Sequence, residues 1–292
     1  MRQLIAITAA LSPSLAAAHG AGLSGGTPEP WIVLAIFLTA VAYGTGLVRI
    51  WRRSGRGRGI SVIQASSFWA GWLALIAVLS PPLERVASQS FSVHMLQHEL
   101  LMLVVAPLLV AGRPLAVFAW ALPRRLRLHV APVLATRWLR VGWLCLTAPL
   151  VATLLQLVAL WVWHAPRLFD AAVESRDIHA LQHITFLATA LCFWWATRAT
   201  TPENSARSSP YLFVTMIGSG ALGALLAFSG EPWYAAYGGS TSPYGWSPLE
   251  EQQVGGLLMW IPGGTVYMGA ALWGLHRWLN AGTRPGRRTG FA

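Results

Sequence analysis

The dominant feature of the sequence is a series of apolar stretches, each about long enough to cross a lipid bilayer. A transmembrane helix needs about 20 apolar residues to span a hydrocarbon core of about 30 Å. No stretch alternates apolar and polar residues as a barrel strand would, so their backbones must be satisfied as helices. The sequence therefore predicts an all-α, polytopic membrane helix bundle with seven transmembrane helices. The stretches are Trp31 to Ile50, Ser61 to Leu79, Phe91 to Ala111, Thr147 to Trp163, Ile178 to Ala196, Pro210 to Ser229 and Val254 to His276.

Composition supports a lipid environment. Of the 292 residues, 55% are hydrophobic and only 11% are charged, whereas soluble proteins devote about 25% of their residues to charged side chains. All 21 basic residues are arginine, and they give a formal net charge of +11. Because these arginines gather near the ends of the predicted helices, the charge indicates membrane topology and argues against a nucleic-acid partner.

The first 18 residues resemble a cleaved export signal. Arg2 precedes a short apolar run, Leu4 to Leu11, and the small residues Ala16 to Ala18 follow. We expect residues 1–18 to be a signal peptide, although an uncleaved first segment is the alternative. Residues 19–30 would form a flexible periplasmic N-terminus, residues 31–279 one membrane domain and residues 280–292 a basic cytoplasmic tail.

The distribution of arginine orients the predicted bundle. With the mature N-terminus outside, 17 of the 21 arginines lie on the inner side and three on the outer side, and one belongs to the signal. By the positive-inside rule, the inner side is cytoplasmic. The sequence thus predicts a multi-pass protein of the bacterial inner membrane, with a periplasmic mature N-terminus and a cytoplasmic C-terminus.

Histidines near the predicted outer end suggest a metal site. His94 and His98 are four residues apart, as are His179 and His183, so each pair shares one helix face. His164 ends the helix between them, and metal sites are often built in the core of a helix bundle. We expect some of these five rings to hold a metal ion.

Other side chains near these histidines are weaker candidates. Met95 and Met102 could add thioether ligands, which would favour copper, although methionine also commonly fills cores. Glu99 could orient a histidine from outside the ligand set. His19 could capture copper at a free N-terminus. Neither Cys145 nor Cys192 is placed to join the outer histidines.

Three alternatives remain open from the residues alone. The histidines could be hydrogen-bonding groups between helices. Two of them could ligate haem axially in a membrane electron-transfer protein. A metal transporter is the third alternative, since Pro262 to Gly264 should kink the last helix.

Several ordered motifs resemble the CtaG-type cytochrome c oxidase assembly factors, which are membrane proteins associated with caa-type oxidases. The resemblance implies a non-enzymatic role in maturing a haem-copper oxidase, with its catalytic subunit as the partner and copper as the ion that is inserted. The motifs are His94-Met95-Leu96-Gln97-His98, Gly112-Arg113-Pro114-Leu115, Trp163-His164-Ala165-Pro166 with Asp170-Ala171-Ala172, His179 to His183 with Phe193-Trp194-Trp195, and Glu251-Gln252-Gln253 with Gly255-Gly256 and Met259-Trp260-Ile261-Pro262-Gly263.

Overall fold

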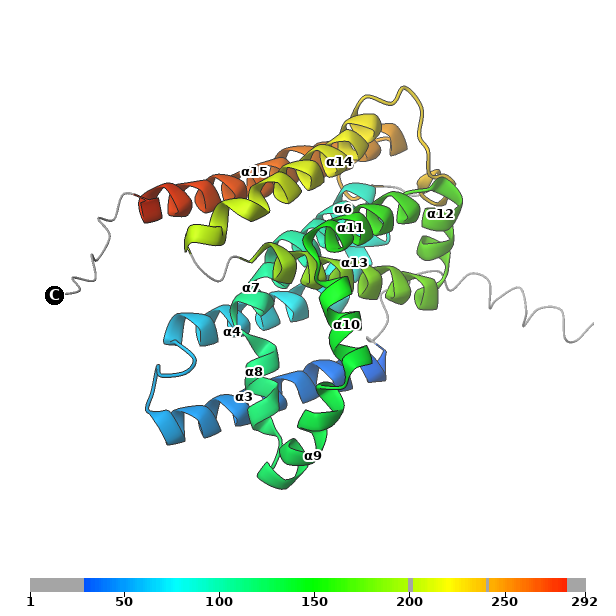
Figure 1. The fold of residues 1–292 in the computed structure, drawn as a ribbon. Coiled ribbons are helices and arrows are strands. Elements are labelled where there is room, and N and C mark those ends of the chain that lie inside the picture. Colours follow the sequence, from blue (N-terminus) through cyan, green and yellow to red (C-terminus); the bar gives the residue numbers. More distant parts are fainter. Residues whose placement is uncertain (1–28, 199–201, 240–241, 283–292) are drawn as a thin grey trace, which may run out of the picture.

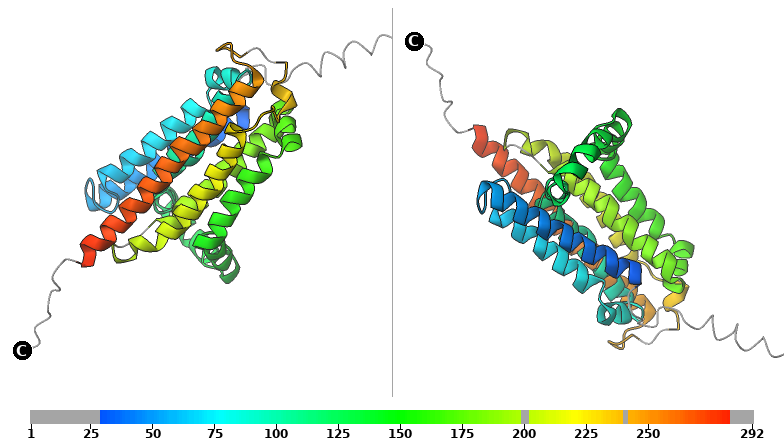
Figure 2. Two further views of the ribbon diagram at one scale, coloured as in Figure 1. Left: turned by 90° about the horizontal axis from the view of Figure 1, so that it is seen from above. Right: turned by 90° about the horizontal axis from the view of Figure 1, so that it is seen from below.

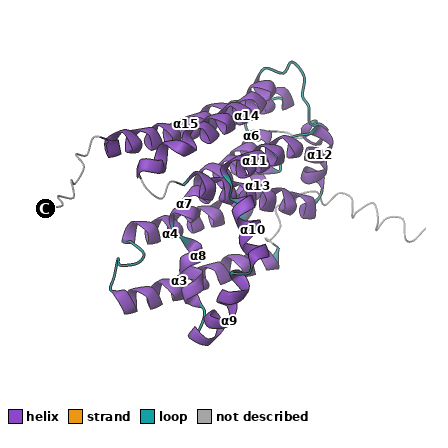
Figure 3. Cartoon of the chain, viewed as in Figure 1, coloured by secondary structure: helices purple, strands orange, loops and turns teal. Residues whose placement is uncertain are grey.

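The computed structural model describes residues 29–198, 202–239 and 242–282. Within these ranges all regular secondary structure is helical, with no strand (Figure 3), which confirms the predicted all-α class. The predicted signal peptide, most of the predicted periplasmic segment with His19, and residues 283–292 of the predicted tail lie outside the described residues.

Each predicted apolar stretch corresponds to a helix or to consecutive helical segments. The third stretch is continuous across α6, a π-helical segment η1, and α7. The bounds are α3 (Pro30–Ser54), α4 (Val62–Val78), α6 (Phe91–Leu100), η1 (Leu101–Val105), α7 (Ala106–Ala111), α11 (Pro149–Trp163), α13 (Arg176–Thr197), α14 (Ser209–Ala227) and α15 (Pro248–Gly282).

Shorter helices connect these segments. The residues between the third and fourth apolar stretches form three of them, α8 to α10. The connecting helices are α5 (Pro81–Ala87), α8 (Pro114–Ala121), α9 (Arg124–Leu134), α10 (Arg137–Leu146), α12 (Pro166–Glu174), and the 3-10 helices η2 (Pro202–Ser208) and η3 (Ala235–Tyr237).

Fewer segments than seven are clearly long and apolar enough to span a bilayer. Among the residues that the structure describes, three segments qualify, namely Pro30–Ser54, Phe91–Ala111 and Asn204–Ala227. The count rises to five if each of two bent helix pairs is one span: α4 with α5, bent by 53°, and α10 with α11, bent by 64°. Polar residues of α13, including two histidines and a glutamine, lower its mean hydropathy.

The long helices run roughly along a common direction, and α8 to α10 project from one side of this bundle (Figures 1 and 2). α15 packs on α14 and α6, α4 packs on α7, and α13 packs on α7 and α11. One end of the bundle holds α12, η3 and the beginning of α15. The opposite end holds the end of α3, the beginning of α4 and the end of α15 (Figure 1).

Local sequence explains where α15 begins and how far it extends. Ser247 and Glu250 form a capping box, since the Ser247 backbone N–H donates to Glu250 Oε2 over 2.7 Å and the Glu250 N–H donates to Ser247 Oγ over 3.3 Å. Helix α15 continues through Pro262 to Gly282, so the segment at which we expect a kink lies inside one continuous helix.

Close contact between α14 and α15 depends on two glycines. A Cβ atom on Gly256 would lie 2.5 Å from the Gly223 carbonyl oxygen and 2.6 Å from the Ala227 nitrogen. Both neighbours are backbone atoms, so the two helices would have to separate to admit a side chain.

We expect Gly256→Val to destabilise the protein by about 1 to 3 kcal/mol, the usual cost of overpacking. Thermal unfolding of the purified full chain in detergent measures this loss. Gly264→Ala is the matched control in the same helix, because no heavy atom lies within 4 Å of its added Cβ. Equal unfolding temperatures for the two variants would contradict the close approach of α14 and α15.

Candidate metal centre

Four histidines from two helices meet inside the bundle. His94 and His98 lie on α6, and His179 and His183 lie on α13, each pair separated by one helical turn. One ring nitrogen from each residue lies within 4.8 Å of the corresponding nitrogen of every other. All four side chains are buried, with exposed fractions of 8% or less. We call these residues the four-histidine centre.

A tyrosine fixes the orientation of His94. The Tyr237 hydroxyl donates to the Ala87 carbonyl oxygen over 2.8 Å and lies 2.8 Å from His94 Nδ1. Burial raises the pKa of the Tyr237 phenol well above its ordinary value, and the charges of Glu84, Glu251 and Asp170 add to this, so the phenol keeps its proton. Because that proton points to Ala87, His94 Nδ1–H is the donor to the tyrosine oxygen. His94 Nε2 then presents a lone pair to the centre.

A carboxylate orients His179, as Tyr237 orients His94. Glu84 Oε1 on α5 lies 2.9 Å from His179 Nδ1. Gln97 Nε2 donates to Glu84 Oε2 over 3.0 Å and to the Val78 carbonyl oxygen over 2.7 Å, which holds the carboxylate in place. Metal-binding histidines commonly donate their second N–H to such a carboxylate, which fixes the tautomer and increases the basicity of the ligating nitrogen.

Several polar atoms of the centre lack hydrogen-bond partners among the described residues. His94 Nε2 and His98 Nε2 do have a partner, since they lie 3.0 Å apart and His98 Nε2–H donates to the lone pair of His94 Nε2. His179 Nε2, His183 Nε2 and His98 Nδ1 have no partner in the described structure, although all are buried. Unsatisfied buried polar atoms are uncommon in proteins and call for an explanation such as an ion.

The spacing of the nitrogens suits a small ion. A tetrahedral ion bound to nitrogen at 2.0 to 2.1 Å requires ligand atoms about 3.3 Å apart. The four nitrogens, all within 4.8 Å of one another, approach this geometry with small side-chain shifts. Phe169 and Phe186 stand beside the rings, with centroids 5.2 Å from His94 and 4.8 Å from His98, respectively. Both phenylalanines are fully buried, so the centre has apolar walls.

His164 lies next to the centre but outside the group of four. Its ring centroid is 6.5 Å from that of His98. His164 Nδ1 donates to the Leu160 carbonyl oxygen over 2.7 Å, and His164 Nε2 lies 3.4 Å from Met95 Sδ. The predicted ligand His164 and the weaker candidate Met95 therefore form a neighbouring pair.

The remaining candidates are directed elsewhere. Met102 Sδ accepts a hydrogen bond from Gln156 Nε2 over 3.0 Å. Glu99 faces α15, where a Cβ atom on Gly263 would lie 3.3 Å from Glu99 Oε2, and this oxygen has no partner among the described residues. Cys145 is exposed, Cys192 is partly buried, and neither belongs to the group of four.

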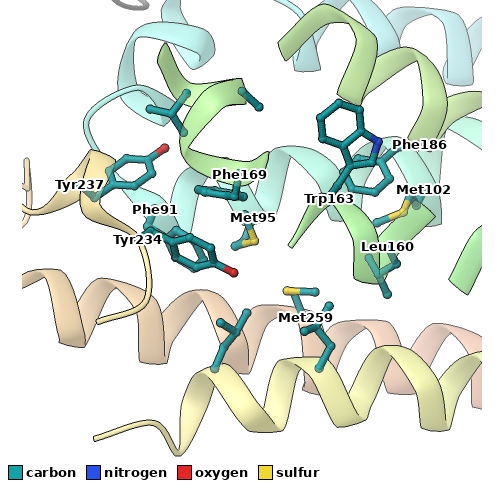
Figure 4. Close-up of a cluster of buried hydrophobic side chains, with 14 of the residues drawn as sticks. Phe91, Met95, Met102, Leu160, Trp163, Phe169, Phe186, Tyr234, Tyr237 and Met259 are labelled. Carbon is teal, nitrogen blue, oxygen red and sulfur yellow. The ribbon is translucent and has the colours of Figure 1, made fainter. Parts of the chain in front are cut away.

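The loop between α14 and α15 covers the centre. Tyr237 reaches His94, and the Tyr234 hydroxyl donates to the His164 carbonyl oxygen over 3.1 Å. The Ala235 and Ala236 backbone N–H groups donate to the Asp170 carboxylate. Figure 4 shows Tyr234 and Tyr237 beside Phe91, Phe169 and Met95. We call the described residues of this loop, 228–239 and 242–247, the lid, because Tyr237 contacts His94 and Tyr234 contacts the His164 backbone.

Glu251, on α15, forms hydrogen bonds to the lid and to the start of α6. Its Oε2 accepts from Ser90 Oγ over 2.7 Å and from the Ser92 N–H over 2.9 Å, and its Oε1 accepts from Ser242 Oγ. Ser90 also caps α6, which carries His94 and His98. Burial, the largest single influence, raises the pKa of Glu251, but the hydrogen bonds from Ser242, Ser92 and Ser90 together lower it below its ordinary value.

We expect Glu251→Gln to reduce stability at neutral pH by about 1.5 to 3 kcal/mol, the usual worth of hydrogen bonds to a charged group. Because the folded pKa of Glu251 is lowered, its stabilisation is present above the unfolded value of 4.5 and is lost as pH falls. Unfolding temperatures of the wild type and the variant should therefore converge below pH 4.5. The control is Glu231→Gln, an exposed carboxylate of the same loop. A temperature difference that persists unchanged in acid would contradict the assignment.

Comparison with known proteins identifies the family. The sequence profile of the cytochrome c oxidase caa3 assembly factor family (Caa3_CtaG) matches residues 41–281, which is most of the chain. The chain belongs to this family. All residues of the four-histidine centre, together with Glu84 and Tyr237, lie within the region that the family profile matches.

Two relatives are uncharacterised proteins of Mycobacterium bovis and Mycobacterium tuberculosis. Each is 27% identical over 235 residues, which cover 76% of this chain and 34% of the relative. The chain thus spans about a third of the length of the relatives it matches. No solved structure matches the chain.

Sequence reasoning missed two residues of the site, Glu84 and Tyr237. Glu84 precedes the first histidine by ten residues, and Tyr237 lies in the lid. A signal for Glu84 was available: an acidic residue at the outer end of the bundle, close in sequence to a histidine pair, is a common partner of a metal ligand.

Proposed function

We propose that this cytochrome c oxidase assembly factor binds copper at the four-histidine centre and supplies it to the catalytic subunit of a haem-copper oxidase. Its role would be delivery during assembly rather than catalysis. Copper is the cargo, and it would pass to a docked oxidase subunit by exchange of ligands.

The observation that carries the proposal is the convergence of four buried imidazoles, two of which are oriented by outer partners. His94 and His179 each have one nitrogen held by Tyr237 or Glu84, and the other nitrogen faces the centre, where His94 Nε2 is hydrogen-bonded to His98 Nε2 and His179 Nε2 has no partner among the described residues. A network that only joined helices would be expected to satisfy its polar atoms, yet three ring nitrogens have no partner in the described part of the chain.

We also propose a disposition in the bacterial inner membrane. Seven spans would follow from counting α13 and α15 with the five segments described above. The four-histidine centre would then lie near the periplasmic face, and the arginine-rich end of α3, the arginine-rich start of α9 and the end of α15 with Arg277 would lie at the cytoplasmic face, in keeping with the positive-inside rule.

The spacing of the rings favours a single ion over the haem alternative. His94 Nε2 and His98 Nε2 lie 3.0 Å apart on one helix, whereas axial haem ligands must stand on opposite sides of a macrocycle. The centroids of His94 and His179, which come from different helices, are only 5.0 Å apart.

Elemental analysis and a visible spectrum of the purified full chain test the proposal. Copper bound in a fixed ratio to protein, without a Soret band, is the expected result. A Soret band would indicate haem and overturn the copper proposal. Uptake of copper into sealed vesicles that contain only this protein would instead support the transporter.

A further inference from the structure

A second site is formed at the opposite end of the bundle, where α3, α8 and α9 meet. A cavity of about 690 Å³ is lined there by three arginines, Arg53, Arg113 and Arg127, and by Trp120. Figure 1 places these helices away from α12 and η3, so the cavity is remote from the four-histidine centre.

The side chain of Trp120 positions two of these arginines. The guanidinium carbon of Arg127 lies 4.1 Å from the centroid of the Trp120 ring, and that of Arg53 lies 5.5 Å from it. Contacts of this kind between a cation and an aromatic face are attractive. Arg49 in turn donates to the carbonyl oxygens of Trp120 and Ala121, which fixes the end of α8.

The charge of this cavity is uncompensated. None of its lining residues is acidic, and within the described ranges no carboxylate lies within ion-pair distance of Arg53, Arg113 or Arg127. Like charges held close together repel, so the arrangement favours a bound anion. Arg113 also has a φ of 53°, a left-handed conformation that is unusual for a residue with a side chain and is often found at functional sites.

Apolar side chains also line this basic cavity. They are Ile50 of α3, Ile60 of the following loop and Ala116 of α8. A ligand with a phosphate and a hydrocarbon chain would match both features. Arginine is well suited to phosphate because its planar group donates two parallel hydrogen bonds.

We infer that the cavity between α3, α8 and α9 binds the phosphate group of an anionic phospholipid. Basic pockets between helices on the cytoplasmic side of membrane proteins recognise such headgroups. The bound lipid would hold α9 against α3 at the membrane surface.

Native mass spectrometry of the delipidated full chain, titrated with phosphatidylglycerol, tests this inference. Wild-type protein should bind one phosphatidylglycerol at least about tenfold more tightly than Arg53→Gln/Arg127→Gln does. The loss of a single hydrogen bond between an arginine and the charged phosphate is enough to weaken binding about tenfold. Arg124→Gln/Arg125→Gln removes the same charge from the same end of the molecule but leaves the cavity residues intact, so it should bind like the wild type. An equal loss of phosphatidylglycerol affinity in both double variants would show that the lipid is attracted to the basic surface in general, and it would overturn the inference.

A second measurement on the wild-type protein does not depend on the folding of any variant. Phosphatidylcholine, whose choline cation neutralises its phosphate, should bind about tenfold more weakly than phosphatidylglycerol, because the cation is repelled by the three arginines. Calorimetric titration with inorganic phosphate distinguishes a soluble anion from a lipid. Tight binding of inorganic phosphate without preference for phosphatidylglycerol, or no preference between the two lipids, would overturn the lipid assignment.

Discussion

Replacement of His94 and His98 together by alanine is expected to remove tight copper binding from the purified protein. These residues supply two of the four converging nitrogens, and their Nε2 atoms lie 3.0 Å apart. The loss of affinity should exceed the roughly 10- to 100-fold effect of removing an outer partner of a metal ligand. Copper content after loading and dialysis against a competing chelator measures it.

Two further variants make this experiment decisive. His179→Ala/His183→Ala should lose copper to the same degree, because it removes the other half of the centre. His129→Ala/His276→Ala should retain wild-type copper, since both of those histidines are exposed and lie outside the centre. Truncating buried rings also leaves cavities, so unfolding temperatures of the metal-free proteins must be measured in parallel. Equal copper content in all the folded variants would refute copper binding at this centre.

The positions of the long helices and of the histidine pairs could be predicted from the sequence because both depend on local patterns. Apolar length locates the helices, and a spacing of four places His94 above His98 and His179 above His183 on their own helix faces. Glu99 illustrates the limit of such reasoning. It follows His98 directly, so it projects about 100° around the helix, and it meets α15 at Gly263.

Which histidine each outer partner contacts depends on tertiary structure, so local sequence patterns could not predict these pairs. Tyr237 is 143 residues from His94 in the sequence, and only the folding of the lid brings the two together. Glu84 reaches His179 across 95 residues because α5 turns by 53° from α4. His164 shows the same dependence, since the end of α11 directs its ring to Met95 and leaves it beside the four-histidine centre.

Glu84→Gln is expected to weaken copper binding by roughly 10- to 100-fold without removing a ligand, which is the usual effect of losing a charged partner behind a metal-binding histidine. Glutamine retains the size of the side chain and can still accept from His179 Nδ1–H. It lacks the negative charge that makes the other ring nitrogen a stronger donor to a cation. Competition titration with a copper chelator measures the affinity, and the number of ions bound per protein should remain unchanged.

Measuring both the unfolding temperature and the copper affinity distinguishes this electrostatic role of Glu84 from a structural one. Gln97 also bonds to Glu84 and thereby joins α6 to α5, so a loss of structure alone would lower the unfolding temperature of the metal-free protein. The predicted effect is instead weaker copper binding with little change in that temperature. Glu174→Gln, which removes an exposed carboxylate from α12 at the same end of the bundle, should leave the affinity unchanged. If Glu84→Gln also left it unchanged, the carboxylate would serve only to join the helices, and orientation of His179 would not contribute to copper binding.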